Sequence, residues 1–205
     1  SIIFLIPIIT VVLNSFKDKF SISQTPFVLP DTDTFAGTEN YISGINDTGF
    51  LQAFFWSLFI TVLSVAVIVL FTAMTSWYII RIKSRFNSIL YYLFVFSMIV
   101  PFQMVMFTMS KIANVLSLDN PLGLVFIYLG FGAGLSVFIF SGFIKSVPIS
   151  LEEAAVIDGC NPFQTFWRVV FPVLKPTAVT VAILNTMWVW NDYLLPYLEI
   201  GSDYK

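Results

Sequence analysis

The stretch Ser150–Cys160, "SLEEAAVIDGC", decides the fold, because it sets a short polar helix between two long apolar segments. Ser150 and Glu153 have the spacing of a capping box, in which the serine hydroxyl accepts the Glu153 N–H and the carboxylate reaches back to the cap. Leu151–Asp158 is long enough for two helical turns, and Gly159 favours a left-handed stop. The sequence therefore predicts a short helix with its own start and stop signals.

A second helix is expected directly after the first. Asn161 is a favoured cap residue and Pro162 suits the first helical position, so a helix is expected from there until Pro172 ends it. Apolar area beside charge marks a partner site, whereas the alternative is a structured loop that covers the mouth of a helix bundle. The apolar residues in question are Leu151, Ala154, Ala155, Phe163, Phe166 and Trp167.

The composition of the 205-residue chain is that of a membrane protein. Hydrophobic residues make up 58% and charged residues 11%, against about 25% charged in soluble domains. The mean hydropathy is +0.88. The net charge of −2 and the lack of a basic block give no support to nucleic-acid binding, and a single cysteine cannot form an internal disulfide.

We predict an all-α polytopic membrane protein in which residues 1–205 form one transmembrane domain. A span needs about 20 apolar residues, so the shorter run at 1–13 is expected to be part of a span in a longer protein. A polar segment at 14–50 is expected to be an external loop. The remaining predicted spans are 51–80, 88–109, 121–144 and 174–195, with the polar segment 145–173 between the last two.

Basic residues near the ends of the spans predict the orientation, because cytoplasmic loops carry more Lys and Arg. Arg81, Lys83 and Arg85 form a compact basic loop. If that loop is cytoplasmic, the order of the spans puts 145–173 on the same side. The cytoplasmic side then holds Arg81, Lys83, Arg85, Lys145, Arg168 and Lys175, and the external side holds Lys17, Lys19, Lys111 and Lys205.

Polar residues inside the predicted spans are candidates for a solute pathway, because they are costly in a bilayer. Asn185 is expected near the midplane, where interhelical hydrogen bonding is the competing interpretation. Trp188 shares its face and has the flat surface that stacks on sugars. Gln103 follows Pro101, which is expected to kink the third span. Asn191 lies near the outer end of the last span, where anchoring at the membrane surface is the alternative.

The segment around the opening stretch resembles the EAA loop of binding-protein-dependent ABC importer permeases. Glu153-Ala154-Ala155, Gly159 and Val169-x-Phe171-Pro172 have the spacing of that loop, with Val169 and Phe171 as conservative departures. "PISLEEAAVIDGCNPFQTFWRVVFPVLKP", followed by "WNDYLLPYL", is similar to the MalG-like, carbohydrate-uptake group of these permeases. The resemblance covers essentially the whole chain and is strongest over 146–196.

The resemblance implies a six-span subunit of the prokaryotic cytoplasmic (inner) membrane, of which this chain covers about five spans. It implies that the 145–173 loop couples the permease to two copies of a cytoplasmic ATPase, with a second homologous permease and an extracytoplasmic solute-binding protein as further partners. ATP and Mg²⁺ would bind the ATPase, and this chain would bind no cofactor. Glu153 would meet a basic ATPase residue, with Glu152 or Asp158 sharing that contact. The implied docking residues are Leu151, Glu152, Glu153, Ala154, Ala155, Asp158 and Gly159.

Three other functions compete with a sugar permease subunit. An ABC importer permease for a non-sugar solute shares the same loop. An intramembrane enzyme is disfavoured because the chain has no histidine, which removes Ser–His and HExxH chemistry. A secondary transporter or channel would be expected to carry ionisable relays or inverted repeats at mid-depth, and we find neither pattern.

Overall fold

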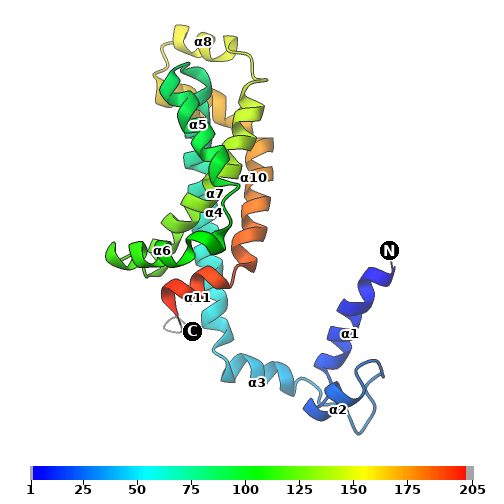
Figure 1. Cartoon of the computed structure of the whole chain (residues 1–205). Helices are drawn as coiled ribbons and strands as arrows, with labels where there is room; N and C mark the ends of the chain where they lie inside the picture. Colours follow the sequence, from blue (N-terminus) through cyan, green and yellow to red (C-terminus); the bar gives the residue numbers. More distant parts are fainter. Residues whose placement is uncertain (1, 202–205) are drawn as a thin grey trace. The chain divides into compact units, whose positions relative to one another are not determined.

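The computed structural model describes residues 2–201, which form helices and contain no strands beyond an isolated bridge between Lys17 and Phe35. Ser1 and Lys205, both used in the predictions above, lie outside the described residues. The chain divides into two compact units, with the boundary between Phe55 and Trp56. The elements of both units are labelled in Figure 1.

The first unit contains the predicted external segment, which is a small folded structure rather than an open loop. A 3₁₀ turn at Ile2–Leu5 leads into α1 (Ile6–Ser15), followed by α2 (Lys19–Gln24) and α3 (Glu39–Asp47). Asp18 caps α2, and hydrogen bonds from Ser21 lower the pKa of this carboxyl. The Asn40 amide donates to the Ser15 and Lys17 carbonyl oxygens at 2.9 and 2.7 Å, which ties α3 to the end of α1.

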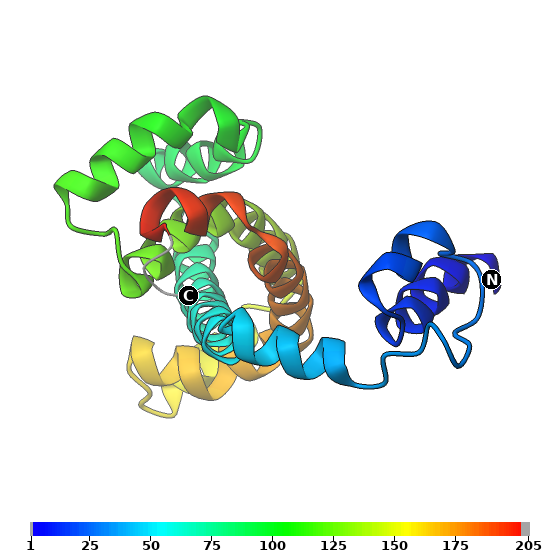
Figure 2. The same cartoon turned by 90° about the horizontal axis from the view of Figure 1, so that it is seen from below.

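The second unit is organised around α4 (Phe50–Arg81, continuing from the first unit) and α7 (Pro121–Ile144). With 32 residues, α4 is about 48 Å long, more than a hydrocarbon core of ~30 Å requires. The bounds of both helices nearly coincide with the predicted segments 51–80 and 121–144. Within α7, Leu124, Tyr128, Val137 and Phe140 are fully buried, and α5 and α10 pack beside it (Figure 2).

The span predicted at 88–109, with a kink at Pro101, is two separate helices in the structure. The chain forms α5 (Arg85–Ser97) and α6 (Phe102–Val115), which are bent by 109° relative to each other. Pro101 is extended, with φ −63° and ψ 137°, and its ring prevents the α5 hydrogen-bond pattern from continuing. The sequence signal for a kink was present, but the bend is large enough to turn α6 across the direction of α5 (Figure 1).

Two boundaries after residue 160 also differ from the predictions. Pro172 does not end a helix: α9 (Pro162–Thr165) continues through the π-helical turn η2 (Phe166–Val170) into α10 (Phe171–Asn191). In η2 the Phe171 N–H donates to the Phe166 carbonyl, and this wider turn brings Pro172 into the first turn of α10, where its missing N–H is tolerated. The span predicted to reach 195 ends at Asn191, and α11 (Leu194–Ile200) follows.

Length and composition make three helical segments of residues 2–201 capable of crossing a membrane. They are Phe50–Arg81, Pro121–Ile144 and Pro162–Asn191, and the bent pair α5–α6 would make a fourth if it is one broken span. In Figure 1 the short helix α8 (Ser150–Ile157) lies at the end of this bundle where α4 ends and α5 begins.

Candidate functional site

The helix α8 stops as predicted but starts differently. Gly159 has φ +84°, and the Cys160 N–H donates to Ala155 O at 2.9 Å while the Gly159 N–H donates to Val156 O at 3.0 Å. These two bonds form a Schellman motif, which fixes the direction of the chain after the helix. The stop signal is therefore confirmed.

The predicted capping box at Ser150 and Glu153 is wrong. Ile149 is the N-cap residue, it is helical, and it makes no side-chain cap hydrogen bond. The Leu151 N–H is instead satisfied by Pro148 O, and the Glu152 and Glu153 N–H groups by Ile149 O. A side-chain cap is unnecessary because the preceding turn already supplies backbone acceptors. A capping box does occur at Asn161 and Gln164, where it starts α9.

An ion pair holds α8 against the membrane-spanning helix α4. The Glu152 carboxylate lies 2.7 Å from Arg81 and also accepts a hydrogen bond from the Trp77 indole at 2.9 Å. Arg81 donates in addition to Val147 O at 3.0 Å. Glu152 is buried, so its charge is used within the chain. The expectation that Glu152 helps to meet an outside partner is therefore incorrect for this structure.

The exposed residues of α8 and its C-cap include both apolar and acidic side chains. Ile157 is 85% exposed and Val156 is 61% exposed. Glu153 is exposed and its carboxylate makes no hydrogen bond or ion pair within residues 2–201, so no cap competes for it. Leu151, Ala154 and Asp158 are also exposed, whereas Ala155 faces inward and is buried. Sequence reasoning missed Val156 and Ile157, although two apolar residues directly before a polar helix stop were a usable signal.

Aromatic packing joins η2 to α4 and α10. Phe166 is buried against Trp77, with ring centroids 5.6 Å apart, and contacts Trp167 and Phe171 at 5.3 and 5.8 Å. Only Phe163 of the three predicted aromatic residues is largely exposed, at 63%. The residues after Gly159 therefore connect α8 to α10 through a packed and continuous helical path.

The four candidate pathway residues do not form one cluster. Asn185 is buried and donates to Ser136 Oγ at 3.1 Å and Val181 O at 2.8 Å, which is the interhelical bonding named as the alternative. Trp188 packs edge-on against Tyr128 at 5.5 Å. Asn191 is exposed and donates to the Met187 carbonyl, while Gln103 is exposed on α6.

A second polar group, missed by the sequence reasoning, lies beside Trp188. The Tyr128 hydroxyl donates to Asp192 at 3.1 Å, and the other Asp192 oxygen accepts the Leu194 N–H at the start of α11. These residues are 64 positions apart, so no local pattern could have paired them. Residues 2–201 contain no group of three His, Cys, Asp or Glu side chains that could hold a metal ion.

The long apolar helices are those of a multi-pass membrane protein. The family model for the inner membrane component of binding-protein-dependent transport systems matches residues 71–202. The chain belongs to this family. It is therefore a permease subunit of an ABC importer, located in the inner membrane, and it works with an ATPase and a solute-binding protein. Permease subunits are not themselves enzymes.

Two relatives match nearly the whole chain. The sequence is 38% identical over 202 residues to the probable starch degradation products transport system permease protein AmyC of Thermoanaerobacterium thermosulfurigenes, covering 98% of this chain and 73% of that protein. It is 39% identical over 207 residues to the multiple sugar-binding transport system permease protein MsmG of Streptococcus mutans, with the same two coverages. These matches confirm the resemblance drawn from the EAA-like segment.

A solved structure supports the fold. A bacterial ABC transporter involved in the import of the acidic polysaccharide alginate contains a chain that matches with a TM-score of 0.81. The match covers 96% of this chain and 68% of that chain at 23% sequence identity, and at this identity it shows the fold. No match supports a secondary transporter or a channel.

Proposed function

We propose that this chain forms half of the translocation pathway for a sugar or an oligosaccharide, together with a second, homologous permease subunit and two copies of the ATPase. The substrate class rests on the two relatives at 38% and 39% identity, which are permeases named for starch degradation products and multiple sugars. ATP and Mg²⁺ bind the ATPase in this proposal, and the permease chain binds no cofactor. A non-sugar solute has no comparable support.

The helix α8 is the surface that docks into the ATPase. This assignment rests on the observation that α8 has one side attached to the bundle and one side exposed. Glu152 is bound to α4, while Ile157 remains 85% exposed. An exposed isoleucine beside unpaired acids suits a partner cleft that is apolar within and basic at its rim. Glu153 and Asp158 supply the negative charge, and Ala154 allows close approach.

Two connections would carry a displacement of α8 into the bundle. The first is the Glu152–Arg81 ion pair, supported by Trp77, which leads to the end of α4. The second is the Schellman turn at Gly159 and the continuous path through α9 and η2 into α10. Packed helices move as rigid bodies, so ATPase closure is expected to shift α4 and α10 together.

The end of the bundle that carries α8 faces the cytoplasm in this proposal. The Arg81–Glu152 contact puts the basic loop after α4 and the 145–173 segment at one end, which supports the shared side that the order of the spans predicted. Exposed Lys83, Arg85, Lys145 and Arg168 belong to the same two segments, and exposed Lys175 lies two residues after the second one. Basic residues favour the cytoplasmic side. At the other end, Trp188 and Asn191 remain the better candidates for sugar contact.

Photo-crosslinking tests the docking assignment. p-Benzoylphenylalanine is introduced at position 157 of the full-length permease in its assembled transporter, and at position 115 as a control. Val115 is 76% exposed but lies on α6. We expect illumination to attach the ATPase at position 157 and not at position 115. Failure to capture the ATPase at 157, or equal capture at both positions, would reject the assignment.

A further inference from the structure

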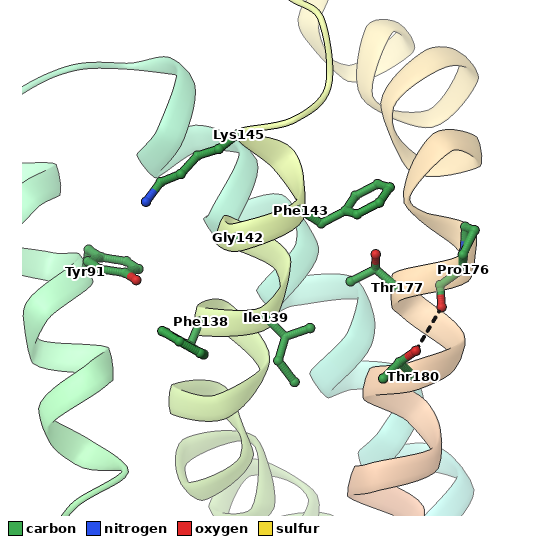
Figure 3. A pocket seen from close by; sticks show the side chains of 9 residues that line it. All are labelled: Tyr91, Phe138, Ile139, Gly142, Phe143, Lys145, Pro176, Thr177 and Thr180. Carbon is green, nitrogen blue, oxygen red and sulfur yellow. Dashed lines mark hydrogen bonds between the residues drawn. The ribbon is translucent and has the colours of Figure 1, made fainter.

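Two neighbouring cavities open at the end of the bundle that carries α8. One, of about 520 Å³, lies between α5, α7 and α10 (Figure 3), and the other, of about 730 Å³, lies between the end of α4, the start of α5 and the end of α7. Tyr91 and Lys145 line both of them. The Lys145 ammonium lies 5.5 Å from the centre of the Tyr91 ring, so this pair marks the place where the cavities meet.

The larger cavity is basic. Arg81, Lys83, Arg85 and Lys145 line it, and no Asp or Glu does. Arg81 is neutralised by Glu152, and this is the one ion pair within residues 2–201. Lys83, Arg85 and Lys145 are exposed and have no acidic partner in that part of the chain. An anion placed among these three side chains would therefore meet uncompensated positive charge.

The smaller cavity is an apolar continuation along α7. Phe138, Ile139 and Phe143 line it from α7, and Thr180 from α10. The Thr180 hydroxyl already donates to the Pro176 carbonyl at 3.2 Å, so it does not need a partner in the cavity (Figure 3). The groove is open over Gly142, because a Cβ at this position would meet no atom within 4 Å.

We propose that an anionic phospholipid occupies both cavities, with its phosphate among Lys83, Arg85 and Lys145 and one acyl chain in the groove over Gly142. Basic pockets between transmembrane helices on the cytoplasmic side bind anionic head groups, and the proposal rests on the orientation given above for this end of the bundle. A soluble anion would leave the apolar groove unfilled, and a lipid without net charge would leave the net positive charge of the site uncompensated. The phospholipid satisfies both parts of the site.

Native mass spectrometry of the assembled, delipidated transporter tests this site. The complex is titrated with dioleoylphosphatidylglycerol or dioleoylphosphatidylcholine. We expect tighter binding of the phosphatidylglycerol, and a loss of about fivefold in its affinity for each basic residue removed. The variant Arg85→Gln/Lys145→Gln should thus lose about 25-fold. Lys175→Gln is the control, because Lys175 is exposed near the same end but lines neither cavity.

A second pair of variants tests the groove without changing charge. Gly142→Leu would fill the space over α7, whereas Gly130→Leu adds the same side chain to the same helix at a position that also has no atom within 4 Å. We expect phosphatidylglycerol binding to fall in Gly142→Leu and to be unchanged in Gly130→Leu.

Three results would overturn the proposal: equal affinity for the two lipids, no effect of the charge and groove variants, or failed subunit assembly in Gly142→Leu with lipid binding unchanged. The last would mean that a protein segment fills the groove. ATP-dependent uptake by the wild-type preparation is measured in parallel, so that a failure of the proposed transport function is recognised separately.

Discussion

At the scale of single residues, Glu152 determines how α8 is attached to the bundle. Its carboxylate is held by Arg81 and Trp77 across 71 and 75 positions of sequence. Its neighbour Glu153 has the same chemistry but is exposed and unpaired within residues 2–201. The two adjacent glutamates therefore have different roles, one inside the permease and one on its proposed docking surface.

This difference gives a first prediction. Glu152→Gln leaves the partly buried Arg81 without its counter-charge and should destabilise the assembled transporter by about 1.5–3 kcal/mol. Because α8 would then be attached less firmly to α4, more ATP should be hydrolysed for each solute molecule imported. Thermal unfolding and the ratio of hydrolysis to uptake measure the two effects. Glu153→Gln serves as the control for stability and should leave the unfolding temperature unchanged; an equal loss in both variants would contradict the assignment.

Gly159 is the second residue with a specific requirement. Its φ of +84° lies in the left-handed region, which costs a residue with a Cβ roughly 1–2 kcal/mol. We expect Gly159→Ala to tilt α8 and reduce coupled transport, and Gly159→Asn to be milder, because asparagine tolerates this conformation better. The measurement is uptake per ATP hydrolysed. Gly130→Ala, in a regular part of α7, is the control, and normal coupling in Gly159→Ala would remove the proposed role of the turn.

At the scale of elements, α7 is held closely by its neighbours through two glycines. A Cβ on Gly132 would lie 2.7 Å from both Asn185 Oδ1 and Ile68 Cδ1, and one on Gly134 would lie 2.8 Å from the Phe94 carbonyl. Ile68 is fully buried, so it cannot easily move away. The small residues thus allow α4, α5 and α10 to approach the same helix.

The contact at Gly132 predicts a position-specific effect. Gly132→Ala should destabilise the complex by about 1–3 kcal/mol, because overpacking forces Ile68 or Asn185 out of place. Gly130→Ala, two residues earlier on α7, should be close to neutral, because its Cβ would meet no atom within 4 Å. Thermal unfolding of the purified complex compares the variants. Equal unfolding temperatures for the two would show that the close approach is not needed.

Local signals predicted some elements well and others poorly. Asn161 and Pro162 start a helix, and Gly159 ends one, because these effects depend on neighbouring backbone groups. The cap at Ser150 failed because Pro148 and Ile149 supply acceptors that a pattern search does not consider. Pro172 was predicted to end a helix and does not, because the π-helical turn before it places Pro172 where its missing N–H is tolerated.

Predictions for the candidate site also succeeded in some respects and failed in others. The sequence located the short helix proposed to dock, but the pairs Glu152–Arg81 and Tyr128–Asp192 join residues more than 60 positions apart and depend on the helix packing. Asn185 was placed correctly inside the bundle, but its partner Ser136 lies on another helix. The choice between a pathway residue and an interhelical hydrogen bond for Asn185 therefore required the arrangement of α7 and α10.

At the scale of the whole molecule, transport depends on subunits other than this chain. Its family membership assigns ATP hydrolysis to another subunit, and its structure contains the helix α8, proposed to dock there, attached both to α4 and, through η2, to α10. The central claim is that closure of an ATPase displaces α8, and that this displacement changes the arrangement of these helices around a sugar pathway.

Uptake of a radiolabelled oligosaccharide into proteoliposomes tests this claim most directly. Vesicles contain the full-length permease with its partner permease and solute-binding protein, either with or without the ATPase, and ATP is supplied on the ATPase side. We predict concentrative uptake only when the ATPase and ATP are both present. Concentrative uptake by vesicles that lack the ATPase would contradict the account.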